Sequence, residues 1–146
     1  MIRMARGLSQ SHPRRTDLTG GIGGLFFFVE RQGMKRIIVG LSGASGVIYG
    51  IRLLEILQAL PDMESHLVMS TAAATTIPLE TDYTPEEVRG LATVDYRFKD
   101  IAAAISSGSF RTDGMIVLPC SMKTLATIAY SFSDNLLTRA ADVVLK

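Results

Sequence analysis

The sequence predicts an α/β fold of the doubly wound kind, in which helices cover both faces of a parallel sheet. Three observations support this prediction. From Met34 onward, segments with strand character alternate with segments of helical period, and the connections between them are short. The strand segments are apolar almost throughout, as is typical of strands buried on both faces. The chain has 146 residues, 47% hydrophobic and 20% charged, which suits one domain with one core.

The first part of this region holds two strand signals and two helix signals. Residues 36–41 are rich in β-branched side chains and predict the first strand. Apolar residues recur at helical spacing through residues 47–60, and a Pro-Asp pair then ends that helix. Residues 65–69 predict the second strand. Residues 71–77 predict a short helix that ends before Pro78, because a proline disfavours helical geometry in the residue before it.

A clear helix start follows at Thr84. Thr84 is a good N-cap residue, Pro85 takes the first helical position and Glu87 stands where a capping box requires a carboxylate. The three signals agree, so we expect a helix to begin here.

The last part of the chain predicts one more strand and two more helices. Residues 115–118 have strand character, and Ser121 can cap a helix that runs to about residue 130. A final helix is predicted to start after Asp134 and to run to the last residue, Lys146. The order of strands and helices therefore implies a parallel sheet.

Residues 1–33 differ in character from the rest. They contain several arginines, with no acidic residue before Asp17, which weakly resembles a transit peptide. A glycine cluster and an apolar run follow at residues 20–29, with neither helical nor strand period. We interpret residues 1–33 as an N-terminal extension that is disordered or not native, with Met34 as the native start, and residues 34–146 as the folded domain.

The composition argues against several kinds of protein. The net charge of +1 gives no sign of a nucleic-acid partner or of an acidic membrane surface. No apolar run approaches the roughly 18 residues that a membrane span needs. A single cysteine excludes an internal disulfide and suits the reducing cytoplasm. The chain has only two histidines in addition to that cysteine, and they are far apart in the sequence, so a dedicated metal site is not expected.

Small and hydroxyl-bearing residues follow three predicted strands, at residues 42–46, 70–71 and 119–121. Ligands of parallel sheets bind beyond the carboxyl ends of the strands. Small residues let the backbone approach a ligand, and the helix that follows directs free N–H groups toward it. These features suit a phosphate or the edge of a flavin. The glycines of the first segment do not form the dinucleotide-binding fingerprint, so a tight turn without a ligand is an equal alternative.

Cys120 is a candidate nucleophile that we reject. A reactive cysteine needs a basic partner, and His66 lies within a predicted strand without an evident claim to that role. We interpret Cys120 as an ordinary buried small residue, which is the commoner case.

Two pairs of charged residues leave alternatives open. Glu80 and Asp82 are either solvated or include a site acid. Arg139 and Lys146 lie seven residues apart on one face of the last predicted helix, either as a solvated basic stripe or as charge for a phosphate ester. The polar loop at residues 106–109 either only connects its neighbours or folds over a ligand.

Five segments, in this order, resemble the flavin prenyltransferase family of the UbiX type. They are MKRIIVGLSGASG at residues 34–46, LET at 79–81, ISSGSF at 105–110, LPCSMKTL at 118–125 and TRAADVVLK at 138–146. One such segment would be a weak signal, but five in the right order are specific.

The resemblance implies a flavodoxin-like Rossmann subunit in a homo-oligomer, a dodecamer in the family, with FMN bound between subunits. It also implies the reaction, in which dimethylallyl phosphate alkylates reduced FMN at N5 and C6 without a metal. The prenylated FMN would then serve UbiD-type decarboxylases, including one in ubiquinone biosynthesis.

The resemblance also assigns residues by position. Ser45 and Glu80 would assist proton transfer at the flavin, whereas Lys146 and Arg139 would face phosphate. The FMN contacts would be Gly43, Ala44, Ser45, Ser70, Ser121, Met122, Lys123 and Thr124.

Family members continue past the position of Lys146, so the resemblance implies that the domain at residues 34–146 lacks C-terminal elements. Two other functions stay open. One is a related FMN-dependent cysteine decarboxylase, which shares the fold. The other is a non-catalytic module that binds a flavin or a nucleotide.

Overall fold

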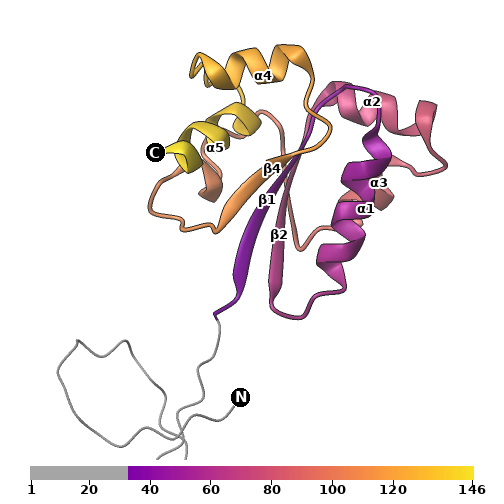
Figure 1. Ribbon diagram of the computed structural model, residues 1–146, viewed down its shortest axis with the longest axis horizontal. Helices are drawn as coiled ribbons and strands as arrows, with labels where there is room; N and C mark the ends of the chain where they lie inside the picture. The colour runs from indigo at the N-terminus through magenta and orange to yellow at the C-terminus, as the bar shows by residue number, and fades with distance from the viewer. Residues whose placement is uncertain (1–32) are drawn as a thin grey trace, which may run out of the picture. The chain divides into compact units, whose positions relative to one another are not determined.

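Four parallel strands form one sheet, in the order β3-β2-β1-β4 (Figure 1). This computed structural model describes residues 33–146, so the predicted extension at residues 1–33 lies outside the described residues except for Gly33. The strands are β1 (Lys35–Leu41), β2 (Met63–Met69), β3 (Val94–Tyr96) and β4 (Gly114–Val117).

Helices form a layer on each face of the sheet, as Figure 1 shows. One layer holds α1 (Val47–Gln58), α2 (Thr71–Glu80) and α3 (Pro85–Gly90). The other holds α4 (Met122–Ala129) and α5 (Leu136–Leu145), with a short 3-10 turn, η1 (Ala104–Ser106), packed against α5. The predicted doubly wound α/β fold is therefore confirmed.

β1 separates two hydrophobic cores. Val39 and Leu41 pack into the core formed with α1 and α2, whereas Ile38 packs into the core formed with α5. All three side chains are fully buried, because successive side chains of a strand point to opposite faces and both faces here are covered. The continuous apolar run at residues 36–41 is thus explained by helices on both sides.

The predicted helix starts are confirmed. The backbone N–H of Thr84 donates to Glu87 Oε2 at 2.7 Å, and the Glu87 N–H donates back to Thr84 Oγ1 at 3.2 Å. This capping box satisfies two backbone donors that have no partner inside the helix. Ser121 caps α4, and Asn135 caps α5 by accepting from the Thr138 N–H at 3.1 Å.

The prediction that a helix ends before Pro78 is wrong, since α2 continues through Pro78 to Glu80. Ile77 is fully buried and anchors this part of the helix in the core. Its carbonyl oxygen accepts from both the N–H and the hydroxyl of Thr81, at 2.9 and 2.8 Å. The burial of Ile77 and these two hydrogen bonds to its carbonyl outweigh the preference for extended geometry that a proline imposes on the residue before it.

The helix predicted over residues 47–60 ends earlier, at Gln58, and Leu60 is 45% exposed. The sequence analysis also missed β3. That strand has only three residues, too few to show an alternating pattern. It forms because it pairs with β2, with Val94 opposite His66.

His66 lies inside the sheet in an apolar and aromatic setting. Its Nδ1 is 3.0 Å from the Tyr96 hydroxyl, and its ring meets the Phe110 ring edge-on at 5.3 Å. Its Nε2 has no hydrogen-bond partner and lies 3.5 Å from Glu64 Oε1. Burial lowers the pKa of His66 below its usual 6.5, although Glu64 opposes the shift and Arg36 adds to it.

We therefore predict that His66 makes the protein sensitive to acid. Because its pKa is lower in the folded than in the unfolded chain, the unfolded chain takes up the proton first. The free energy of unfolding should fall as the pH drops below 6.5, by up to about 1.4 kcal/mol per pH unit from this group. Urea denaturation of the wild type and of His66→Phe at pH 7.0 and 5.5 measures this. Equal losses in both proteins would contradict the prediction.

Candidate functional site

The direction in which the sheet grows changes at β1. β2 and β3 follow on one side of β1, and β4 lies on the other. The connections that leave β1 and β4 run to opposite faces, toward α1 and α4 (Figure 1). Such a switch point opens a crevice at the carboxyl ends of the two strands, which is where parallel sheets bind ligands.

A cavity of about 370 Å³ lies at this switch point. It is lined by residues that follow β1, β2 and β4, together with residues of α4 and α5. Five of the predicted site residues line it: Gly43, Ser70, Ser121, Lys123 and Thr124. The structure thus brings together residues from three turns that are far apart in the sequence.

The sequence analysis missed other residues of this cavity. They come from α2, from the segment after β3, from α4 and from the region where α5 begins: Ala72, Phe98, Thr127, Asp134, Asn135, Leu137 and Thr138. The sequence did predict that a helix begins at Asn135. Nothing local placed that helix start beside the ends of β1 and β4.

Two hydroxyl groups shape the helix starts at the cavity. Ser70 Oγ accepts from the Ala73 N–H at 3.0 Å and caps α2. Ser121 Oγ accepts from the Thr124 N–H at 3.2 Å and donates to Thr124 Oγ1 at 3.0 Å. The positive ends of both helix dipoles therefore lie at the cavity, which favours an anionic group there.

Gly43 is the point of closest approach between two of these turns. A side-chain carbon at Gly43 would overlap the Cβ and the backbone of Ala72 in α2. The absence of a side chain at residue 43 therefore lets the first turn of α2 press against the end of β1.

Glu80 is the last residue of α2, and its side chain reaches the start of α1. Its Oε2 accepts from the Gly46 N–H at 2.9 Å, and Gly46 adopts a left-handed φ of 91° that suits glycine. The bond from Gly46 lowers the pKa of Glu80, and bonds from the Ser45 hydroxyl and the Val47 N–H act in the same direction against partial desolvation. Glu80 is therefore a carboxylate with a lowered pKa whose position is fixed by the Gly46 N–H, and neither Glu80 nor Ser45 lines the switch-point cavity.

Arg139 and Lys146 share one partner on α5. Arg139 Nη1 lies 3.2 Å and Lys146 Nζ 2.8 Å from Asp142 Oδ2, so the two cations lie on one face of the helix as expected. Arg139 Nε also donates to the Ser106 carbonyl at 3.2 Å, which links the polar loop to α5. The hydrogen bond from Lys146 lowers the pKa of Asp142. Neither cation lines the switch-point cavity.

The interpretation of Cys120 as a buried residue is wrong, since its side chain is exposed. It follows the turn after β4, where the side chain points out of the packed interior. Partial desolvation still raises the pKa of the thiol, which donates a long hydrogen bond to the Ser121 carbonyl at 3.8 Å. A protonated thiol is a poor nucleophile, which agrees with the rejection of a catalytic cysteine.

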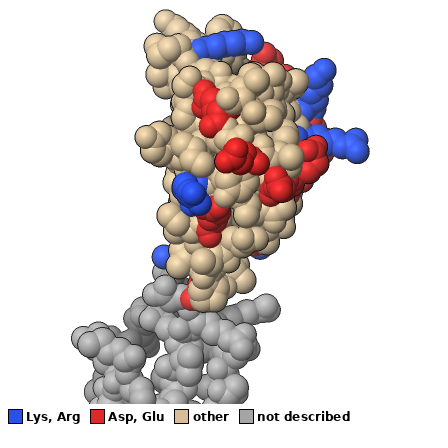
Figure 2. Space-filling view, turned by 90° about the vertical axis from the view of Figure 1, so that its right-hand side faces the viewer, with Lys and Arg blue, Asp and Glu red and all other residues tan. Residues whose placement is uncertain are grey.

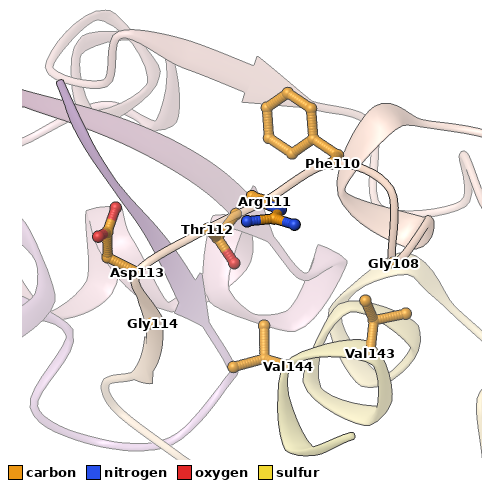
Figure 3. Close-up of a pocket in the computed structure, with 8 residues that line it drawn as sticks. All are labelled: Gly108, Phe110, Arg111, Thr112, Asp113, Gly114, Val143 and Val144. Carbon is orange, nitrogen blue, oxygen red and sulfur yellow. The ribbon is translucent and has the colours of Figure 1, made fainter. Parts of the chain in front are cut away.

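A second cavity, of about 310 Å³, lies between the segment before β4 and the end of α5. Figure 3 shows Phe110, Arg111 and Thr112 on one side and Val143 and Val144 on the other. Of the segments predicted to meet a ligand, only the polar loop at residues 106–109 contributes to it, through Gly108.

The outer surface of the layer formed by α1, α2 and α3 carries acidic side chains. Figure 2 views the side where α1, α2 and α3 lie, with acidic side chains in the middle of the face and basic ones toward its borders. On α1, the Glu55 carboxylate accepts from Arg52 Nη1 at 2.6 Å. Among residues 33–146, no group of His, Cys, Asp and Glu has the arrangement of a metal site. Within the same residues, no helix is long and apolar enough to span a bilayer.

A cavity at the switch point of a parallel sheet places the chain among the doubly wound α/β proteins that bind a ligand at this crevice. The chain belongs to the Flavoprotein family, whose sequence model matches residues 29–146. It is 63% identical over 113 residues to the flavin prenyltransferase UbiX of Escherichia coli K12, a match that covers 77% of this chain and 60% of that protein. The chain thus spans about three-fifths of the length of this curated relative.

Two solved structures are similar to this one. A dodecameric FMN-dependent UbiX-like decarboxylase from Escherichia coli O157:H7 superimposes with a TM-score of 0.75 at 56% identity, covering 75% of this chain and 60% of that one. AnUbiX (PadA1), in complex with FMN and dimethylallyl pyrophosphate, gives a TM-score of 0.74 at 54% identity, with coverages of 76% and 58%. The predicted resemblance to flavin prenyltransferases is confirmed.

We predict that Gly43→Ala destabilises the protein by about 1–3 kcal/mol, because the new methyl group would force α2 away from the end of β1. Chemical denaturation measures the change in the free energy of unfolding. Gly90→Ala is the matched control, since a side-chain carbon at Gly90 would meet nothing within 4 Å. Equal stability of the two variants would show that α2 yields to the methyl group without cost.

Proposed function

We propose that the protein is a flavin prenyltransferase that binds FMN at the switch-point cavity and prenylates it with dimethylallyl phosphate. The main support is that the cavity is lined by Gly43, Ser70, Ser121, Lys123 and Thr124, all positions that the resemblance assigns to FMN. The high identity to a flavin prenyltransferase agrees with this. The product would serve UbiD-type decarboxylases, including one in ubiquinone biosynthesis, and this link is supported by the resemblance alone.

The residues present fit FMN. The cavity has apolar walls at Phe98 and Leu137 for a flat ring, and hydroxyl groups at Thr124 and Thr138. The start of α4 and the cation of Lys123 suit a phosphate. Reduced FMN, when bound, supplies the nucleophilic N5 and C6 positions.

Glu80 and Ser45 are proposed to handle protons. Alkylation at N5 and at C6 displaces one proton at each position, and closing the ring at C6 across the allyl double bond adds one proton to the prenyl chain, so a group that can both accept and return protons is needed. The pKa of the Glu80 carboxylate is lowered, partly by the Ser45 hydroxyl, and this hydroxyl is proposed to pass a proton from the flavin to the carboxylate. Ala44, Ser45 and Met122 are proposed as further FMN contacts, although none of the three lines the cavity.

Cations are proposed to assist the leaving group. Loss of phosphate from an allylic carbon builds negative charge, which cations stabilise. Lys123 lines the cavity, whereas Arg139 and Lys146 are paired with Asp142 and are assigned to phosphate by the resemblance.

The test of this proposal has a binding step and a reaction step. Flavin fluorescence measures FMN binding, and anaerobic incubation with reduced FMN and either dimethylallyl phosphate or the pyrophosphate reads the product by mass. Binding with prenyl transfer supports the proposal. Binding without transfer from either donor would identify a non-catalytic flavin-binding module instead, and no FMN binding would refute the assigned site.

We predict that Glu80→Gln slows prenyl transfer at least tenfold and leaves FMN affinity within about threefold of the wild type. The amide keeps the size and a hydrogen-bond acceptor for Gly46 but cannot take up a proton at neutral pH. Glu86→Gln, an exposed carboxylate in the first turn of α3, is the matched control and should keep full activity. Unchanged turnover of Glu80→Gln would return Glu80 to a purely structural role at the start of α1.

The protein is also proposed to form a homo-oligomer, and α4 provides the main support. Met122, Leu125, Ala126 and Ala129 are all exposed, and their spacing places them along one face of the helix. Tyr130 and Phe132, 74% and 65% exposed, continue this apolar stripe, with their ring centroids 6.3 Å apart. A surface of this kind is typical of protein contacts, and one similar protein is described as dodecameric.

We predict that Leu125→Glu lowers the molecular mass of the assembly in solution, because a charge in the middle of an apolar contact has no partner. Light scattering after size-exclusion chromatography measures the mass. Ile56→Glu, at a 60% exposed position of α1, is the control and should leave the mass unchanged. An unchanged mass for Leu125→Glu would show that the α4 stripe is not part of the contact.

A further inference from the structure

We infer that Ser42 is a positioning residue that holds the turns after β1 and β4 together so that the cavity between them can accept a flavin. The inference rests on the proposed function. It concerns a residue that lines no part of the cavity and for which the sequence predicted no role of its own.

Ser42 joins the two turns by its side chain and its backbone. Its hydroxyl donates to the Pro119 carbonyl at 2.9 Å and accepts from the Ser121 N–H at 2.6 Å. Its own N–H donates to the same Pro119 carbonyl at 3.2 Å. The side chain is 1% exposed, so water cannot replace these partners.

These hydrogen bonds join the two turns at the cavity itself. Ser42 stands directly before Gly43, and Ser121 is the first residue of the turn that starts α4; both Gly43 and Ser121 line the cavity. The bonds therefore cross the switch point, where the two connections diverge to opposite faces of the sheet. The backbone pairing of β1 with β4 ends there with two bonds, from the Leu118 N–H to the Gly40 carbonyl and from the Ser42 N–H to the Pro119 carbonyl, and the Ser42 hydroxyl extends it to Ser121.

α4 depends on this attachment more than the other long helices do. None of its residues is buried, whereas α1, α2 and α5 each bury two or more. A helix with little buried surface has few packing contacts to fix its position. The Ser42 hydroxyl binds the backbone at the start of α4, so it sets where Ser121, Lys123 and Thr124 stand relative to Gly43.

Ser65 provides a comparison that separates positioning from general stability. It is also 1% exposed, and its hydroxyl accepts from the Thr93 N–H at 3.0 Å. It joins β2 to the segment before β3 and lines neither cavity. Loss of either hydroxyl leaves one buried or half-buried backbone N–H without its partner, so the structural costs are of the same kind.

The experiment compares Ser42→Ala with Ser65→Ala in the full chain. Thermal unfolding is expected to shift by a similar amount in both variants. FMN affinity, measured by flavin fluorescence, should fall about tenfold or more in Ser42→Ala and stay within twofold of the wild type in Ser65→Ala. Ser42→Thr keeps the hydroxyl and should recover most of the affinity. Equal FMN affinity in Ser42→Ala and the wild type would overturn the inference.

Hydrogen exchange at the Ser121 amide gives a second readout that needs no flavin. The amide should be protected in the wild type and should exchange at least tenfold faster in Ser42→Ala. If the wild type bound no FMN, the proposed function would fail, and unchanged exchange at Ser121 would separately overturn the positioning role. If Ser42→Ala did not fold, Ser42→Cys, which keeps the size but bonds weakly, would take its place with the same expected losses.

Discussion

The burial of β1 on all sides is the constraint on which the rest of the structure depends. Its side chains fill two cores, with Val39 and Leu41 on one face and Ile38 on the other, and its backbone pairs with β2 on one edge and β4 on the other. Because both pairings are parallel, three strands end at the same edge of the sheet. The turns that follow them meet there, and the cavity is a consequence of this arrangement rather than a separate feature.

The features that sequence reasoning predicted well are those with local causes. The Thr84 capping box, the Ser121 cap and the apolar run of β1 are each specified by neighbouring residues, and the structure has them where expected. The errors have tertiary causes. α2 continues through Pro78 because Ile77 is anchored in the core, and β3 forms because its backbone pairs with the edge of β2. Phe98 and Thr138 reach the cavity only through the packing of distant segments, which no single stretch of sequence records.

The sheet also separates opposite charges around the cavity. Glu80 is held at the start of α1, in one helix layer, whereas Lys123 belongs to α4 in the other. Lys123 lines the cavity, whereas the Glu80 carboxylate lies outside its lining, at the Gly46 N–H of the turn that follows β1. For a prenyl transfer, this arrangement would keep the group that accepts protons apart from the groups that stabilise a leaving phosphate, so that neither neutralises the other.

Asp142 has a bearing on how strongly α5 can attract anions. Arg139 and Lys146 contribute two positive charges, and the shared carboxylate removes one, so the three side chains together carry a single positive charge. The attraction of this group for a distant dianion is therefore about half of what two free cations would exert. An anion that came into contact with both cations would have to displace the Asp142 carboxylate, which would then be free to turn to solvent. An anion would thus bind at the end of α5 only in exchange for the Asp142 carboxylate, which is the intramolecular counter-ion of Arg139 and Lys146.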